Sequence, residues 1–189
     1  MSRVALGFKA RTGKAILVVL AEGPKVIERT EVALLPEGEF APYHAAEELE
    51  PAAAREHVAK SIATAQRMAT AAIRGAAKRY KLCGCGVLIG PGMPDWTTDE
   101  ILAVHFRMHK AEGELFRDVL VKGAMECGIA LSTLPQKSPF DAAAKLLGVS
   151  RAQLDADLAA LGKSAGPPWG AHQKEAATAA LVALANRRK

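Results

Sequence analysis

The first 35 residues constrain the fold most, because they hold three apolar runs separated by two short turns. The runs cover residues 4–8, 15–21 and 26–35 and are rich in β-branched side chains. The turns at Arg11–Lys14 and Glu22–Lys25 each contain a glycine, and the second adds a proline. Runs of this length bounded by Gly and Pro are typical of strands. The stretch therefore predicts an antiparallel three-strand meander that opens a mixed sheet.

The rest of the chain predicts helices that alternate with two short strands. After a loop over residues 36–43, Pro51 begins a helix that runs to about Tyr80, because apolar residues recur at spacings of three and four. Strands are predicted at 83–89 and 129–134, on either side of a second helix. That helix starts at a capping-box sequence in residues 97–100 and ends at Gly128. Helices follow at 139–147, 150–161 and 172–186, and the last is so rich in alanine that we expect it to pack closely on the sheet.

Length and composition predict one cytoplasmic domain over residues 1–189. Half of the residues are hydrophobic, which is enough for a substantial core. No apolar run approaches the roughly 18 residues of a membrane span. The apolar run at 15–21 is at the short limit for a secretory leader, and a strand explains it better. Because Cys83, Cys85 and Cys127 form no even framework, we expect reduced thiols and exclude secretion.

The net charge of +5 is unevenly distributed, which suits a surface that faces a polyanion. Residues 1–21 carry four basic residues and no acid, and residues 51–81 carry seven basic residues against Glu56 alone. The predicted first helix places most of its basic residues opposite its apolar stripe, either as a solvated face or as a ridge that contacts phosphates. The nucleic-acid-binding candidates are Lys60, Arg67, Arg74, Lys78 and Lys81 on this helix, and Lys9, Arg11 and Lys14 on the first strand pair.

Three antiparallel strands followed by alternating helices and strands are the order of the ribonuclease H-like fold. The second half of the chain resembles RuvC-type Holliday-junction resolvases in residues 109–129, in the segment around Pro139, in residues 144–149 and in the H-x-x-E-A-A pattern from His172. The resemblance implies an α/β mixed sheet flanked by helices. It also implies a nucleic-acid partner, DNA rather than RNA, and a homodimer.

Resolvases of this family cut DNA with two Mg²⁺ or Mn²⁺ ions held by about four carboxylates. The resemblance places the first acid on the first strand, where this chain has Phe8 and Lys9, and the second after the next parallel strand, where it has Gly90. It places the last two ligands three residues apart at the start of the final helix, where His172 and Glu175 have that spacing. A lysine near the metal position opposes cation binding. We therefore expect no metal cofactor, and His172 and Glu175 are the catalytic candidates, with an exposed helix start as the alternative.

These observations leave three hypotheses. The leading one is a ribonuclease H-like domain that binds nucleic acid without the two-metal nuclease activity. The second is an active endonuclease dependent on Mg²⁺ or Mn²⁺ with a rearranged ligand set, such as His172, Glu175 and Glu112. The third is a structural or partner-binding protein, because a fold alone does not assign a function.

Histidines on the second predicted helix are the first of two further patterns. His105, His109 and Glu112 share a helical spacing, but no glutamate follows His105, so the H-E-x-x-H zinc pattern is absent and a polar helix face is expected.

Residues 144–161 resemble a helix-turn-helix with Gly148 at the turn and Ser150 as the cap. Asp157 lies where that motif usually has an apolar residue, which favours two packing helices. In a DNA reader, Arg151 and Gln153 would face the groove.

Overall fold

A five-stranded mixed sheet with strand order β3-β2-β1-β4-β5 lies at the centre of the computed structural model, which describes residues 2–186. The strands are β1 (Val4–Arg11), β2 (Lys14–Ala21), β3 (Lys25–Ala33), β4 (Leu82–Ile89) and β5 (Leu131–Pro135). Strands β1, β2 and β3 form the predicted antiparallel meander, and β4 runs parallel to both β1 and β5. This order and these directions are those of the ribonuclease H-like fold, so the predicted fold class is confirmed.

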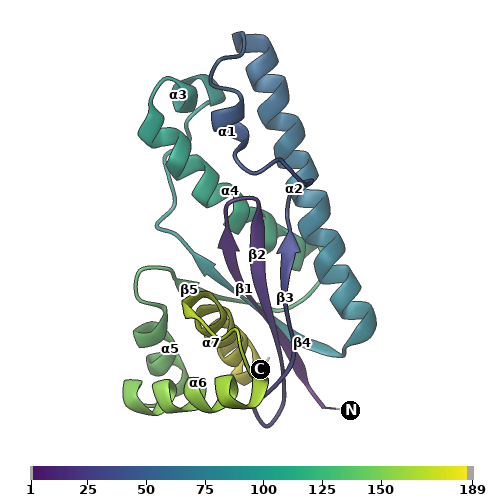
Figure 1. The fold of residues 1–189 in the computed structure, drawn as a ribbon, viewed down its shortest axis with the longest axis vertical. Coiled ribbons are helices and arrows are strands. Elements are labelled where there is room, and N and C mark those ends of the chain that lie inside the picture. Colours follow the sequence, from purple (N-terminus) through teal and green to yellow (C-terminus); the bar gives the residue numbers. More distant parts are fainter. Residues whose placement is uncertain (1, 187–189) are drawn as a thin grey trace.

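Helices cover both faces of the sheet (Figure 1). They are α1 (Pro42–Ala45), α2 (Pro51–Arg79), α3 (Thr98–Leu102), α4 (His105–Glu126), α5 (Pro139–Leu147), α6 (Arg151–Ala165) and α7 (Ala171–Ala185). Helices α2 and α4 share one apolar core with the sheet, and α5, α6 and α7 share the other. The long α2 also extends beyond the sheet, where α1 and α3 lie beside it (Figure 1).

The alternation of β1 divides its side chains between these two cores. Leu6 and Phe8 are fully buried in the core that includes α2 and α4, while Ala5 belongs to the core that includes α7. Lys9, which follows Phe8, therefore points to the α7 side. This placement decides what the end of β1 can do.

Helix α7 packs unusually close to the sheet because the strands beneath it carry glycines. A Cβ at Gly7 would overlap the carbonyl oxygen of Ala176, and a Cβ at Gly86 would overlap that of Ala179. The expectation that the alanine-rich last helix packs closely on the sheet is therefore confirmed.

The predicted second helix is in fact two helices. The capping box is present, since Thr97 Oγ1 accepts from the N–H of Glu100 and the Glu100 carboxylate accepts from the N–H of Thr97. Helix α3 then ends at Leu102, and Val104 is extended before α4 begins. The break lets Ile101 and Met108 both reach the core while Val104 stays exposed. The prediction of one continuous helix was wrong at this point.

The predicted loop over residues 36–43 was also incomplete, because it ends in the short helix α1.

No helix within residues 2–186 has the length and hydropathy needed to cross a membrane. The cytoplasmic location stays a prediction.

Candidate functional site

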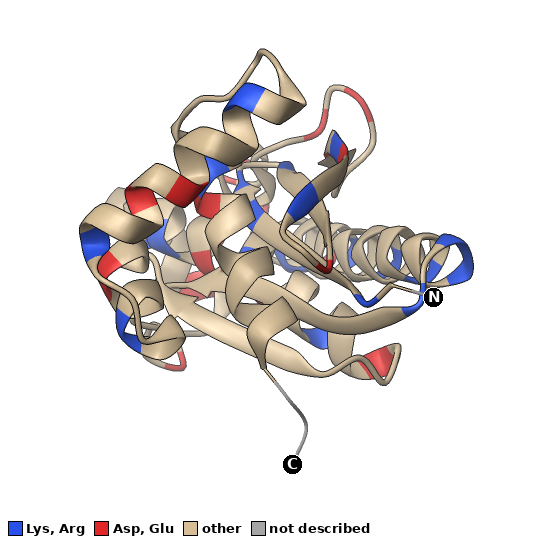
Figure 2. Ribbon diagram, turned by 90° about the horizontal axis from the view of Figure 1, so that it is seen from below, with Lys and Arg blue, Asp and Glu red and all other residues tan. Residues whose placement is uncertain are grey.

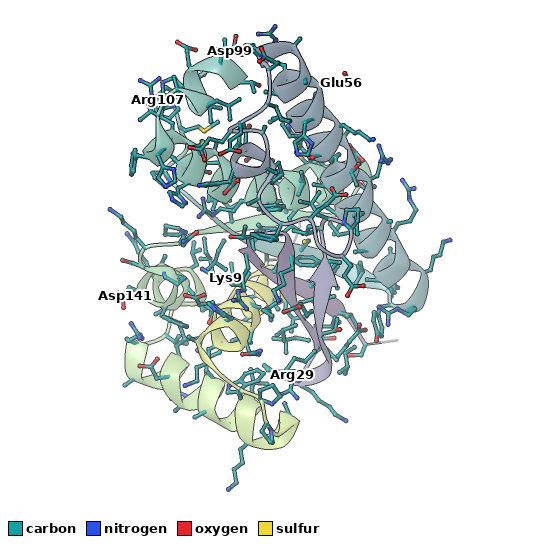
Figure 3. All side chains as sticks on the ribbon, turned by 45° about the horizontal axis from the view of Figure 1, so that its top comes forward. Lys9, Arg29, Glu56, Asp99, Arg107 and Asp141 are labelled. Atoms are coloured by element: carbon teal, nitrogen blue, oxygen red, sulfur yellow. The ribbon has the colours of Figure 1, made fainter. Side chains whose placement is uncertain are left out.

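Lys9 and Glu175 form a nearly buried ion pair where β1 meets the start of α7. Lys9 is only 8% exposed, and its Nζ atom lies 3.1 Å from Glu175 Oε2. Figure 3 shows Lys9 beside α7, between the two halves of the molecule. The Nδ1 atom of His172 lies 3.7 Å from the same carboxylate oxygen. Neither this Nδ1 nor Glu175 Oε2 has a well-aligned hydrogen-bond partner among the described residues, so the contacts are electrostatic in character.

The close approach of α7 to the sheet creates this pair. Because Gly7 has no side chain, the backbone of Ala176 can lie directly against β1. Glu175 precedes Ala176, and Lys9 lies two residues beyond Gly7 on the same face of the strand. The glutamate is thereby brought to the lysine, and the burial of each charge is offset by the other.

A second ion pair fills the space at the end of β4. Beside Gly90, the Glu114 carboxylate lies 3.1 Å from Arg117 Nη1, and both side chains are largely buried. A Cβ at Gly90 would overlap Glu114, so the acid at this strand end comes from α4 rather than from β4. Our sequence analysis missed this pair. Its only signal was an acid and a base three residues apart on a helix.

The residues at these strand ends do not fit a centre with two Mg²⁺ ions. Lys9 and Gly90 supply no side-chain oxygen at the first two expected positions. The carboxylates of Glu175 and Glu114 are each compensated by a basic side chain. Within residues 2–186, Glu175 belongs to no group of three or more His, Cys, Asp or Glu side chains with converging ligand atoms.

A pocket of about 400 Å³ lies next to the Glu114–Arg117 pair, at the carboxyl ends of β4 and β5. Ligands of open α/β sheets bind at this edge. Arg117 and the exposed Lys137 give the pocket two basic side chains. The remaining lining residues are Ile89, Gly90, Pro91, Thr133, Pro135 and Gln136.

Known proteins resemble this chain in structure rather than in sequence. No family model and no curated protein matches it. The structure is similar to that of Thermus thermophilus RuvC. One solved structure is T. thermophilus RuvC in complex with Holliday junction substrate. Its sequence is 13% identical, the match covers 95% of this chain and 91% of the RuvC chain, and the TM-score is 0.49. A second T. thermophilus RuvC structure is 14% identical, with the same coverage and TM-score. The likeness is one of fold alone.

The structure places Lys60, Arg67, Arg74 and Lys78 on the solvent side of α2. Lys81 is also exposed, but it lies two residues beyond the end of the helix, so its predicted place on the helix was wrong. Val58, Ala69 and Ile73 are buried on the opposite side, as predicted. Figure 2 shows basic residues at the end of α2 next to the amino terminus. No ion pair joins these side chains to an acid of residues 2–186. The five exposed residues, which we call the α2 ridge, are Lys60, Arg67, Arg74, Lys78 and Lys81.

The three basic candidates of the first strand pair have different environments. Lys9 is paired with Glu175, and Lys14 Nζ lies 2.9 Å from Glu31 Oε1. Arg11 is exposed and has no acidic partner in the part of the chain that the structure describes. Of these three residues, Arg11 is therefore the one whose charge is available to a ligand.

The helix-turn-helix candidates are engaged within the protein. Arg151 forms ion pairs with Asp141 and Asp155, and Gln153 donates to Asp157. The apolar face of α6 is buried in the core beside α7. These contacts support the interpretation of α5 and α6 as packing helices.

Glu112 is not brought to His172 and Glu175, so the rearranged ligand set of the second hypothesis is not assembled. The Glu112 carboxylate is 5% exposed and accepts from the backbone N–H groups of Tyr43 and His44 at 3.2 Å. It lies between α4 and α1 instead, where it also contacts the ring of His44.

Proposed function

We propose that this chain binds nucleic acid, DNA rather than RNA, through a ribonuclease H-like domain that does not carry out two-metal cleavage. The observation that carries the proposal is the Lys9 ammonium, 3.1 Å from Glu175 at the carboxyl end of β1. A positive side chain thus compensates the carboxylate that a metal ion would need.

The charge of Lys9 opposes a cation at this place. Two-metal hydrolysis needs carboxylates that hold two cations about 3.5–4 Å apart. A metal ion bound to Glu175 would have to displace Lys9 and leave an unpaired ammonium in a nearly buried site. Breaking the ion pair and leaving the ammonium unpaired both cost free energy, so the Lys9–Glu175 pair disfavours metal binding.

Exposed basic groups support the binding part of the proposal. The α2 ridge offers five positive side chains without acidic partners among the described residues, and Arg11 and Lys137 are exposed near the strand ends. Clustered charge of one sign attracts phosphates and releases their counterions. The ridge and the strand-end pocket are separate surfaces, and variants can test each by itself.

A combined binding and cleavage experiment tests the proposal. A labelled four-way junction and a linear duplex are each incubated with the protein in millimolar Mg²⁺ or Mn²⁺. We expect retardation of the DNA without cleavage, and calorimetry should find no tight stoichiometric Mg²⁺ site. Cleavage that disappears with Glu175→Ala would instead establish an active nuclease.

Failure to bind either DNA would remove the proposal and leave the partner-binding alternative. The homodimer is a separate expectation from the resemblance, and light scattering during size-exclusion chromatography measures it directly.

A further inference from the structure

Three histidines from two helices converge on the far side of α4 from the strand-end pairs. His44 comes from α1, and His105 and His109 come from the first turns of α4. The ring centroid of His44 lies 5.1 Å from that of His105 and 4.6 Å from that of His109, and the last two are 4.7 Å apart. One nitrogen from each ring lies within 4.8 Å of the other two. No other His, Cys, Asp or Glu side chains of residues 2–186 form such a group.

The hydrogen bonds of His44 leave one of its nitrogens free. Its Nδ1 lies 2.9 and 3.0 Å from the two carboxylate oxygens of Glu112. In the neutral imidazole, donation to the carboxylate places the proton on Nδ1 and leaves the lone pair on Nε2. This Nε2 is buried and has no hydrogen-bond partner in the described part of the chain. A buried polar atom without a partner is costly unless something binds it.

His105 is more exposed than His44 and makes no hydrogen bond to a carboxylate of the described residues. Its Nδ1 lies 4.0 Å from Glu47 Oε1, and its Nε2 lies 3.1 Å from Nε2 of His109. A shared proton between His105 and His109 would account for that short contact. It would not account for the unpartnered Nε2 of His44, which a common ligand would satisfy.

Glu112 has the position of the residue that orients a metal-binding histidine. Histidine ligands usually donate their second ring N–H to a carboxylate or carbonyl, which fixes the tautomer and the ring direction. Glu112 is buried on α4, holds His44 through Nδ1, and accepts from the backbone of α1 at Tyr43 and His44. The same carboxylate thus docks α1 on α4 and presents the third imidazole to the other two.

We propose that His44, His105 and His109 bind one transition-metal ion of the Zn²⁺ class through their imidazole nitrogens. Imidazoles suit Zn²⁺, Cu²⁺ and Ni²⁺, whereas Mg²⁺ prefers oxygen ligands. Nitrogens about 2.0–2.1 Å from a tetrahedral zinc are ~3.3 Å apart. The contact of 3.1 Å between His105 and His109 matches that spacing. These two side chains are exposed and free to adjust toward His44, and a water or Glu47 completes the coordination.

This site uses none of the residues of the strand-end pairs, so it is independent of the proposed function. It revises the interpretation of His105, His109 and Glu112 as a polar helix face. The sequence did not indicate His44, which lies about sixty residues earlier and reaches the cluster only because Glu112 docks α1. Arg107, labelled in Figure 3, marks the turn of α4 between the two exposed histidines.

Metal titration of the full chain tests the proposal. Chelator-treated protein in a non-thiol reductant is titrated with ZnCl₂ in a calorimeter, and with Co²⁺ while visible absorption is recorded. We expect one equivalent of each ion and a cobalt spectrum of nitrogen and oxygen ligation. The double variant His105→Ala/His109→Ala should lose the site, and its fold should persist because both residues are exposed. His172→Ala removes a histidine elsewhere and should bind as the parent does.

Glu112→Gln tests the positioning role separately. It should keep the stoichiometry and weaken metal affinity about 10- to 100-fold, as loss of an orienting carboxylate does, while circular dichroism checks the fold. The proposal is overturned if the folded parent binds no stoichiometric Zn²⁺ or if binding is unchanged in the double histidine variant. It is also overturned if Cys127→Ser, rather than the histidine variant, removes the ion.

Discussion

At the scale of single residues, Lys9 and Glu175 should depend on each other for stability. Their side chains are 10% and 18% exposed, so removal of one leaves the other charge nearly buried and unpaired. We expect Lys9→Met to lower the free energy of unfolding by about 3 kcal/mol. The double variant Lys9→Met/Glu175→Met should lose clearly less than the sum of the two single changes. Urea denaturation of the four proteins measures the coupling.

Lys14 provides the matched control, because its pair with Glu31 is far more exposed, at 39% and 48% of the two side chains. Lys14→Met should change the free energy of unfolding by no more than about 1 kcal/mol. If Lys9→Met changes the free energy of unfolding as little as Lys14→Met does, the Lys9–Glu175 pair is not a nearly buried interaction.

Cys85 should be chemically silent in the folded protein. Burial, with a smaller contribution from Cys127, raises the pKa of its thiol from 9.0 to about 12. At pH 8 the reactive thiolate is therefore absent. A thiol reagent should modify Cys83 and Cys127 in the native state and the third cysteine only in denaturant. The variant Cys85→Ser should react in the native state as the parent does. After denaturation it should show one reactive thiol fewer, which identifies Cys85 as the unreactive residue.

The same shift sets a direction for stability at alkaline pH. Between pH 9 and about 12 the unfolded chain loses the Cys85 proton while the folded chain keeps it. Unfolding is then favoured, so the contribution of Cys85 to stability falls as pH rises through this window. Below pH 9 both states are protonated and this contribution is constant. Cys85→Ser should reduce the alkaline slope.

At the scale of elements, two glycines should respond in opposite ways to alanine. At Gly86, a Cβ would overlap the backbone of α7, so Gly86→Ala should destabilise by about 3 kcal/mol or more. Gly75 lies inside α2 with nothing within 4 Å of its Cβ position. Gly75→Ala should therefore stabilise by about 0.5–1 kcal/mol through helix propensity. Thermal and urea unfolding of both variants give the sign of each change in the free energy of unfolding. Destabilisation by Gly75→Ala would contradict the open space found around Gly75 on α2.

Elements set by local signals were predicted from the sequence, whereas those set by distant contacts were not. The meander follows from Gly13 and Gly23, both at positive φ, and the start of α3 follows from its capping box. Helix α1 depends on the distant Glu112, which accepts from its backbone. The break before α4 is set by the burial of both Ile101 and Met108 in the core. Periodicity does not contain that information.

The candidate sites follow the same rule. Lys9 and Glu175 were singled out because the resemblance assigned them to adjacent positions, and the structure brings them within 3.1 Å of each other. His44 was not, because it meets Glu112 only when α1 packs against α4. The Glu114–Arg117 pair is local to α4, but its place beside Gly90 depends on how α4 packs against the end of β4.

At the scale of the whole molecule, the net charge of +5 allows DNA to bind at more than one surface. The α2 ridge lies on the helix that covers one face of the sheet, whereas the strand-end pocket opens at the edge between the two helical layers. Mutation of each surface therefore decides which one contacts phosphates. A double substitution on the ridge gives the clearer readout, because each phosphate contact contributes to the salt dependence of binding.

Arg67→Ala/Arg74→Ala should weaken binding to all DNA sequences about equally and reduce the log–log salt slope by about two, since each contact contributes roughly 0.9. Both residues are exposed, so the free energy of unfolding should change by less than about 0.5 kcal/mol for each. Arg55→Ala is the control on the same helix, because Arg55 is paired with Asp99 at 2.7 Å and should contribute little to DNA binding. Fluorescence anisotropy at several salt concentrations measures both slopes. An unchanged slope in the double variant makes the ridge a solvated face, and Arg11→Ala and Lys137→Ala then test whether DNA lies across the ends of the strands.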